Sequence, residues 1–117
     1  MKRLAVLLAC LAGTACSHAA PGLLEQIKTL AAEGSCDSSQ QCRTLPLGAK
    51  SCGGPEAYLA YSTRRDAAQL AALAERYRKQ RVAENEKSGM ASDCRLMTDP
   101  GAVCRAGRCQ TGGAAAE

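Results

Sequence analysis

Residues 35–54 read SCDSSQQCRTLPLGAKSCGG, a run rich in turn-forming residues that carries three cysteines. Beyond residue 19 the chain has six cysteines: Cys36, Cys42, Cys52, Cys94, Cys104 and Cys109. Three of them precede a long stretch of helical character and three follow it. Pairing across that stretch closes longer loops than pairing neighbours, and longer loops stabilise more in the chain-entropy model. We therefore expect disulfides between the two groups, although six cysteines allow other connectivities.

The cysteine spacing favours disulfides over a metal or redox site. The sequence has no Cys-x-x-Cys pair, and its only histidine, His18, lies in the N-terminal segment or just beside it. Zinc sites draw on closely spaced cysteines and histidines, and thioredoxin-like catalysis uses Cys-x-x-Cys. Six cysteines in a small exported chain read as a disulfide framework. We predict three disulfides, no metal and no cofactor.

Residues 1–19 have the composition of a secretory signal. A short basic start precedes an apolar run that is too short to span a bilayer, and small residues follow. Cleavage after Ala19 would give a mature chain that starts at Ala20. Alternatively, residues 13–16 (GTAC) resemble a lipoprotein processing box, with Cys16 acylated. Either route exports the chain to the periplasm, the outer membrane if lipidated, or the exterior, with membrane contact only through lipid on Cys16.

The core that remains after export is lean. The chain is 46% hydrophobic, but Phe and Trp are absent and much of the rest is Ala and Cys. Beyond residue 19 we count fourteen Leu, Ile, Val and Met residues and three Tyr. Small domains with so few large side chains usually need disulfides, metals or partners. The disulfides are therefore expected to carry much of the stability.

Two helices are expected. Residues 20–34 form an amphipathic helix, which packs on the domain or acts as a tether. A long helix over residues 64–87 is capped by Ser62 or Thr63, since residues 63–66 have the spacing of a capping box, and it ends at Ser88-Gly89. Its apolar stripe consists of Ala67, Leu70, Leu73, Ala74 and Tyr77. The charged half beyond Tyr77 is expected to project or stay solvated.

The strands are expected on either side of that helix. Residues 41–47 have strand character, ended by Pro46 and Gly48. Residues 55–61 suit a short helix, because Pro55 fits a first turn. Residues 92–97 are predicted as a strand and residues 102–110 as a tight hairpin around Ala106-Gly107. The prediction is a small disulfide-stapled α+β domain over residues 35–111, with a short antiparallel hairpin sheet packed against the long helix and the amphipathic helix before it. Residues 112–117 are expected to form a disordered tail.

Catalytic machinery is scarce in the mature sequence. Without a histidine or a free thiol, Ser-His and Cys-His nucleophilic catalysis is excluded. The acidic residues fall mainly on helix surfaces beside Arg and Lys, which favours solvated charges over a catalytic pair. Nucleic acid is also disfavoured, because removal of Lys2 and Arg3 leaves 13 basic against 11 acidic residues, with no Phe or Trp for base stacking. We expect a protein that is not an enzyme.

Tyr58 and Tyr61 are the distinctive aromatic residues. On a helix over residues 55–61 they would share a face, because residues three apart are neighbours. They either supply the missing aromatic core or form a surface anchor that contacts a partner protein.

A sequence pattern accompanies these tyrosines. Residues 52–62 read Cys-Gly-Gly-Pro-x-x-Tyr-x-x-Tyr-Ser, preceded by Gly-Ala-Lys-Ser and flanked by the other cysteines. Over about residues 36–110 the chain resembles small uncharacterised cysteine-rich bacterial secreted proteins and lipoproteins. The resemblance implies envelope export and a disulfide framework, and it carries no activity to transfer.

The leading hypothesis is a non-enzymatic envelope or secreted protein that binds a protein or surface partner. The alternative is a disulfide-braced inhibitor of a hydrolase such as a trypsin-like protease. Four basic residues near cysteines could enter its pocket: Arg43, Lys50, Arg105 and Arg108. A third hypothesis is a structural component tethered to the membrane through Cys16.

Overall fold

The computed structural model describes residues 20–89, 91 and 93–112. Along the chain it has α1 (Leu23–Ala32), a 3₁₀ turn (Ser39–Gln41), β1 (Cys42–Leu47), β2 (Ala57–Ser62), α2 (Ala67–Ser88), β3 (Ala102–Arg105) and β4 (Arg108–Thr111). Two helices, two antiparallel two-stranded sheets and three disulfides confirm the predicted α+β class. The predicted signal, the lipidation candidate Cys16 and the last five residues of the predicted tail lie outside the described residues.

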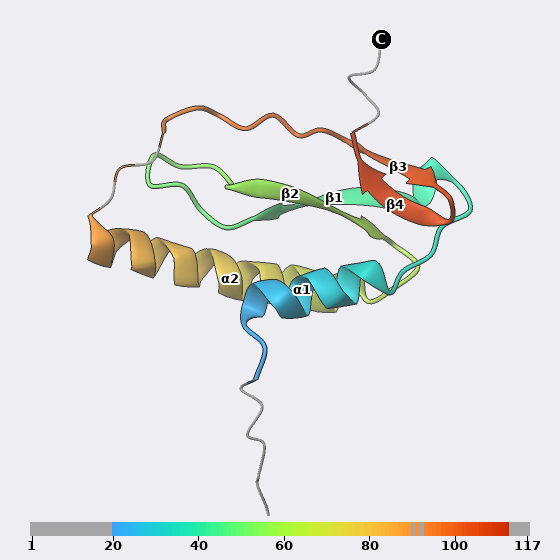
Figure 1. The fold of residues 1–117 in the computed structure, drawn as a ribbon, viewed down its shortest axis with the longest axis horizontal. Coiled ribbons are helices and arrows are strands. Elements are labelled where there is room, and N and C mark those ends of the chain that lie inside the picture. Colours follow the sequence, from blue (N-terminus) through green and yellow to red (C-terminus); the bar gives the residue numbers. More distant parts are fainter. Residues whose placement is uncertain (1–19, 90, 92, 113–117) are drawn as a thin grey trace, which may run out of the picture.

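The β1–β2 sheet separates two layers (Figure 1). The helices α1 and α2 lie on one side of it, and the β3–β4 hairpin with the extended segment leading to it lies on the other. Side chains alternate between the two faces of a strand. Leu45, directly opposite Leu59, therefore points to the helices, while Cys42 bonds to Cys109 of the hairpin on the other face.

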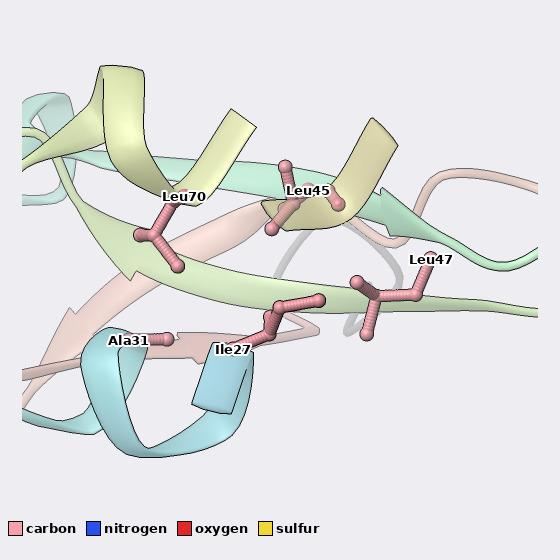
Figure 2. Packing of buried hydrophobic residues seen from close by; sticks show 6 residues of the cluster. Ile27, Ala31, Leu45, Leu47 and Leu70 are labelled. Carbon is pink, nitrogen blue, oxygen red and sulfur yellow. The ribbon is translucent and has the colours of Figure 1, made fainter. Parts of the chain in front are cut away.

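The hydrophobic core is small and lies between the helices and this sheet (Figure 2). Ile27 of α1 and Leu70 of α2 are its two fully buried large side chains, and Leu45 and Leu47 of β1 complete it from the sheet. Burying each side chain of this size gains roughly 1.5–3 kcal/mol. Because Ile27 has no exposed surface, α1 packs as an integral part of the core.

The long helix starts later than the capping box predicted. α2 spans Ala67–Ser88, its N-cap is Asp66, and no side chain caps it. The Thr63 hydroxyl instead donates to the Gln41 carbonyl at 3.1 Å, beyond the end of the β1–β2 ladder. The other end is as predicted, because Gly89 adopts a left-handed φ of 61° and closes the helix.

The predicted helix over residues 55–61 is wrong: this segment forms β2. Antiparallel pairing with β1 outweighs the local helix signal, since it satisfies the main-chain groups of both segments. Tyr61 now lies opposite Arg43 on the helix-facing side, where it packs on the core, whereas Tyr58 lies opposite Pro46 on the other side. The two tyrosines therefore do not share a face. They cannot form the single surface anchor for a partner that a helix would have given.

β1 confirms the strand predicted over residues 41–47, although Pro46 lies inside it and does not help to end it. The Thr63 amide donates to the Gln41 carbonyl at 2.8 Å, so the main-chain groups of every second residue from Gln41 point to β2. The nitrogen of Pro46 falls on the alternate set and faces the outer edge of β1. No ladder bond is lost there, and the missing donor discourages another strand from pairing with this edge.

The predicted strand over residues 92–97 is also wrong. Residues 93–100 have no regular secondary structure, and side-chain contacts hold them in place of a neighbouring strand. The predicted hairpin is present as β3 and β4. Ala106 and Gly107 have φ values of 52° and 75°, which is the pair of positive angles that a two-residue type I′ turn requires.

Candidate functional site

The loop between β1 and β2 is fixed to the second half of α2. Arg81 grips the Glu56 carboxylate, with Nη2 2.7 Å from Oε1, and the Asn85 amide donates to the Ala49 carbonyl at 2.7 Å. Gly48 permits this close approach: it has φ +73°, and a Cβ there would lie 2.2 Å from Glu56 Oε2. We expected the charged half of α2 to project or stay solvated. Most of its charged side chains are indeed exposed, but this half does not project freely, because Arg81 and Asn85 bind the β1–β2 loop.

The same loop carries the first anchor of the segment that follows α2. The Cys52–Cys94 disulfide joins the two segments. Lys50 Nζ lies 2.7 Å from Asp93 Oδ1 and donates to the Arg95 carbonyl at 2.9 Å. Only 13% of the Lys50 side chain is exposed, so it reaches both acceptors from within the loop. Its hydrogen bond, and then its charge, lowers the pKa of the Asp93 carboxyl below the ordinary value.

A second anchor holds the other end of this segment. Thr44 Oγ1 of β1 donates to Asp99 Oδ2 at 2.8 Å. Asp99 Oδ1 accepts a hydrogen bond from the Gly101 amide at 2.9 Å, which closes the turn into β3. Pro100 restricts the residue before it to extended conformations. We call residues 93–99, held at both ends by these contacts, the clamped loop.

The clamped loop presents apolar side chains to solvent. Every residue from 93 to 99 is exposed. Leu96 has 82% of its surface exposed and Met97 39%, although both are large hydrophobic residues. Leu96 lies close to the β1–β2 loop, because a Cβ on Gly54 would be 3.5 Å from its Cδ1. The arrangement is a pair of exposed apolar groups on a main chain fixed at both ends.

A groove of about 640 Å³ lies between α2 and the β1–β2 loop. Apolar groups such as Ala49, Pro55 and Val82 line it, and Glu75 and Arg78 lie at its side. These two charges pair with each other at 2.8 Å, and the hydrogen bond from Arg78 lowers the pKa of Glu75. The charges of Glu75 and Arg78 thus neutralise each other at the side of the groove.

The cysteine sulfurs are structural. The Sγ atoms of Cys36, Cys42 and Cys109 lie within 4.8 Å of one another, a spacing that could suit a metal. They belong, however, to the Cys36–Cys104 and Cys42–Cys109 disulfides, which fix the β3–β4 hairpin to the start of β1. All three disulfides join one cysteine of the first group to one of the second, as loop closure favoured.

Most of the basic residues considered for a protease pocket are engaged in contacts within the fold. Lys50 is engaged with Asp93. Arg43 donates to the Gln40 and Cys42 carbonyls, and Arg108 to the Ala32 carbonyl at 2.7 Å. Arg105 is exposed beside the tight turn. Three of the four guanidinium or ammonium groups thus serve the fold.

Sequence reasoning missed the clamped loop. The sequence did carry a signal for it. Two acidic residues, Asp93 and Asp99, flank the apolar pair Leu96-Met97 shortly after Cys94, and Pro100-Gly101 follows. Because residues 92–97 were predicted as a strand, Leu96 and Met97 were counted as core residues. The structure places them in solvent, and no strand among the described residues pairs with this segment.

The disulfides also indicate the compartment. Three disulfides in so small a chain point to an oxidising, extracytoplasmic location. Neither helix in the described part of the chain has the length and apolar character needed to cross a membrane.

Comparison of the chain with protein-family models, curated proteins and solved structures finds no match.

Proposed function

We propose that this chain is an exported, non-enzymatic protein that binds a protein partner through its clamped loop. The observation that carries the proposal is Leu96, 82% exposed between two anchors. A large apolar side chain held in solvent gains nothing for the fold. Burying it against a partner would gain roughly 1.5–3 kcal/mol.

The anchors favour binding in a second way. A flexible loop loses conformational freedom when it binds, and this cost subtracts from affinity. Lys50 holds the Arg95 carbonyl and Thr44 holds the Asp99 side chain before any partner arrives. Little further ordering is needed, so the contact made by a few residues can be strong.

The chemistry of the remaining residues supports binding without catalysis. Residues 20–117 contain no histidine, and their six cysteines are paired in disulfides. Carboxylates such as Glu56 and Asp93 are engaged by Arg81 and Lys50. The signal-like residues 1–19 favour secretion or an envelope location, and Cys16 would add a membrane tether if it is acylated.

The test compares two double variants in affinity capture from envelope extract and culture medium, read by quantitative mass spectrometry. Leu96→Asp with Met97→Asp places two charges on the clamped loop. Ala68→Asp with Ala72→Asp adds the same charge to exposed positions of α2. We expect a partner that the native protein and the α2 variant retain equally and that the loop variant loses. Equal retention by all three proteins would show that the partner binds elsewhere.

A further inference from the structure

We propose that the clamped loop is a substrate-like inhibitory loop, and that the partner is a serine endopeptidase with an apolar specificity pocket, which accepts Leu96. This inference rests on the proposed function and names its partner class. It replaces the trypsin-like target that the basic residues suggested.

The main chain of the loop suits a protease cleft. Endopeptidases bind the residues around the scissile bond as an extended, accessible segment. Residues 93–99 have no regular secondary structure and are all exposed. In Figure 1 the segment runs as an extended trace along the side of the sheet opposite the helices. A protease can approach it without unfolding any helix or strand.

The hydrogen bonds limit which residues can enter the specificity pocket. The carbonyl of that residue must be free to turn into the oxyanion hole of the enzyme. The Arg95 carbonyl is bound to Lys50 Nζ at 2.9 Å, which removes Arg95 from the choice. Within the part of the chain that the structure describes, the Leu96 carbonyl has no hydrogen-bond partner. Exposure then selects Leu96, at 82% against 39% for Met97, so we place the scissile bond at Leu96–Met97.

Leu96 then defines the class of enzyme. Its side chain is the most exposed large hydrophobic group described, at 82%, and can enter a pocket without rearrangement of its neighbours. An apolar slot of the chymotrypsin type accepts such a side chain, whereas the trypsin pocket is built around a carboxylate.

The anchors explain why the loop would inhibit and not simply be digested. Hydrolysis of the Leu96–Met97 bond consumes one water and leaves a carboxylate on Leu96 and an ammonium group on Met97. The Leu96 end stays attached through Cys94 to Cys52, and the Met97 end through Asp99 to Thr44. Neither new end can leave the cleft freely. Re-formation of the bond, which releases the water, then competes with product departure.

The experiment uses the purified, oxidised protein at micromolar concentration against chymotrypsin, subtilisin and trypsin, each assayed with its own chromogenic peptide. We expect inhibition of chymotrypsin or subtilisin and none of trypsin. Leu96→Gly should weaken the inhibition roughly 10- to 100-fold, because the pocket loses the side chain that it binds. Leu96→Arg should transfer the inhibition to trypsin. Arg105→Ala, an exposed change at the distant hairpin turn, should have no effect.

The outcomes separate this inference from the proposed function. Rapid cleavage at Leu96–Met97 without inhibition would make the loop a substrate and overturn the inference. Inhibition that Leu96→Arg leaves unchanged would assign it to another surface, which also overturns it. If none of the three enzymes is inhibited but the Leu96→Asp, Met97→Asp protein loses its captured partner, the inference fails and the proposed function stands. If capture is also unaffected, both fail.

Discussion

Lys50 shows how much of the site depends on a single side chain. Its ammonium group joins the Asp93 carboxylate and the Arg95 carbonyl, and its carbon stem lies within the β1–β2 loop. A lysine beside a cysteine normally suggests a solvated surface charge. Here the carbon stem of Lys50 is buried and its ammonium group binds two acceptors. The residue is therefore the first anchor of the clamped loop.

This anchor should weaken in acid. Because Lys50 lowers the pKa of Asp93 in the folded protein, the carboxylate contributes stability at all pH values above its ordinary pKa of about 4. That contribution is lost as the pH falls through the lowered pKa of the folded state. We expect the amide NMR signals of Arg95 and Leu96 to stay constant from neutral pH to about pH 4 and to shift below it.

Two variants serve as controls for this titration. Asp93→Asn should place the Arg95 and Leu96 signals near their acid positions at every pH. Asp37→Asn removes an exposed carboxylate that pairs with Arg64, away from the loop, and should leave the transition intact. A transition that persists unchanged in Asp93→Asn would assign the anchor to another group.

At the level of elements, prediction succeeded where the signal was local and failed where a distant partner decides. The hairpin around Ala106-Gly107 and the left-handed end of α2 at Gly89 depend on two or three residues each, and both were predicted. Residues 57–62 carry a local helix signal from Pro55, yet they pair with β1. Nothing within six residues reveals that neighbour, so the segment was assigned to the wrong element.

The contact between α2 and the β1–β2 loop could not be predicted from the sequence for the same reason. Arg81 and Asn85 read as a solvated helix face, since their acceptors Glu56 and Ala49 lie in a loop far along the chain. The apolar stripe of the same helix was predictable, because a spacing of three and four residues is visible in the sequence itself. Leu70 and Ala74 are buried accordingly.

The β3–β4 turn can be improved by one substitution. Ala106 occupies the first central position of a type I′ turn with φ 52°, where Asn is strongly preferred and an alanine Cβ is disfavoured. Ala106→Asn should raise the free energy of unfolding by about 0.5–1 kcal/mol. Thermal unfolding followed by circular dichroism measures the change.

Ala72→Asn is the matched control for the turn, because it makes the same replacement at an exposed position inside α2. It should lower stability by a few tenths of a kcal/mol, through the poorer helix propensity of Asn. Equal effects at the two positions would contradict the assignment of the turn.

Across the whole molecule, the disulfides divide into two kinds. Cys36 and Cys42 are 4% exposed, and their disulfides hold the hairpin against the sheet beside the core. Cys52 and Cys94 are exposed, and their disulfide links the β1–β2 loop to the clamped loop outside the core. One kind stabilises the fold, and the other positions the surface that we propose binds a partner.

This division predicts an order of reduction. Thiol–disulfide exchange requires access of the attacking thiolate to a sulfur, so limiting dithiothreitol should open Cys52–Cys94 first. Alkylation and peptide mapping should then label these two cysteines while the far-ultraviolet circular dichroism stays native, since Ile27 and Leu70 remain packed and two disulfides persist. A Cys52→Ala, Cys94→Ala protein should match the partly reduced state in both spectrum and capture behaviour. Labelling of Cys36 or Cys104 before Cys94, or simultaneous loss of all three disulfides, would show instead that the loop disulfide and the core form one cooperative unit.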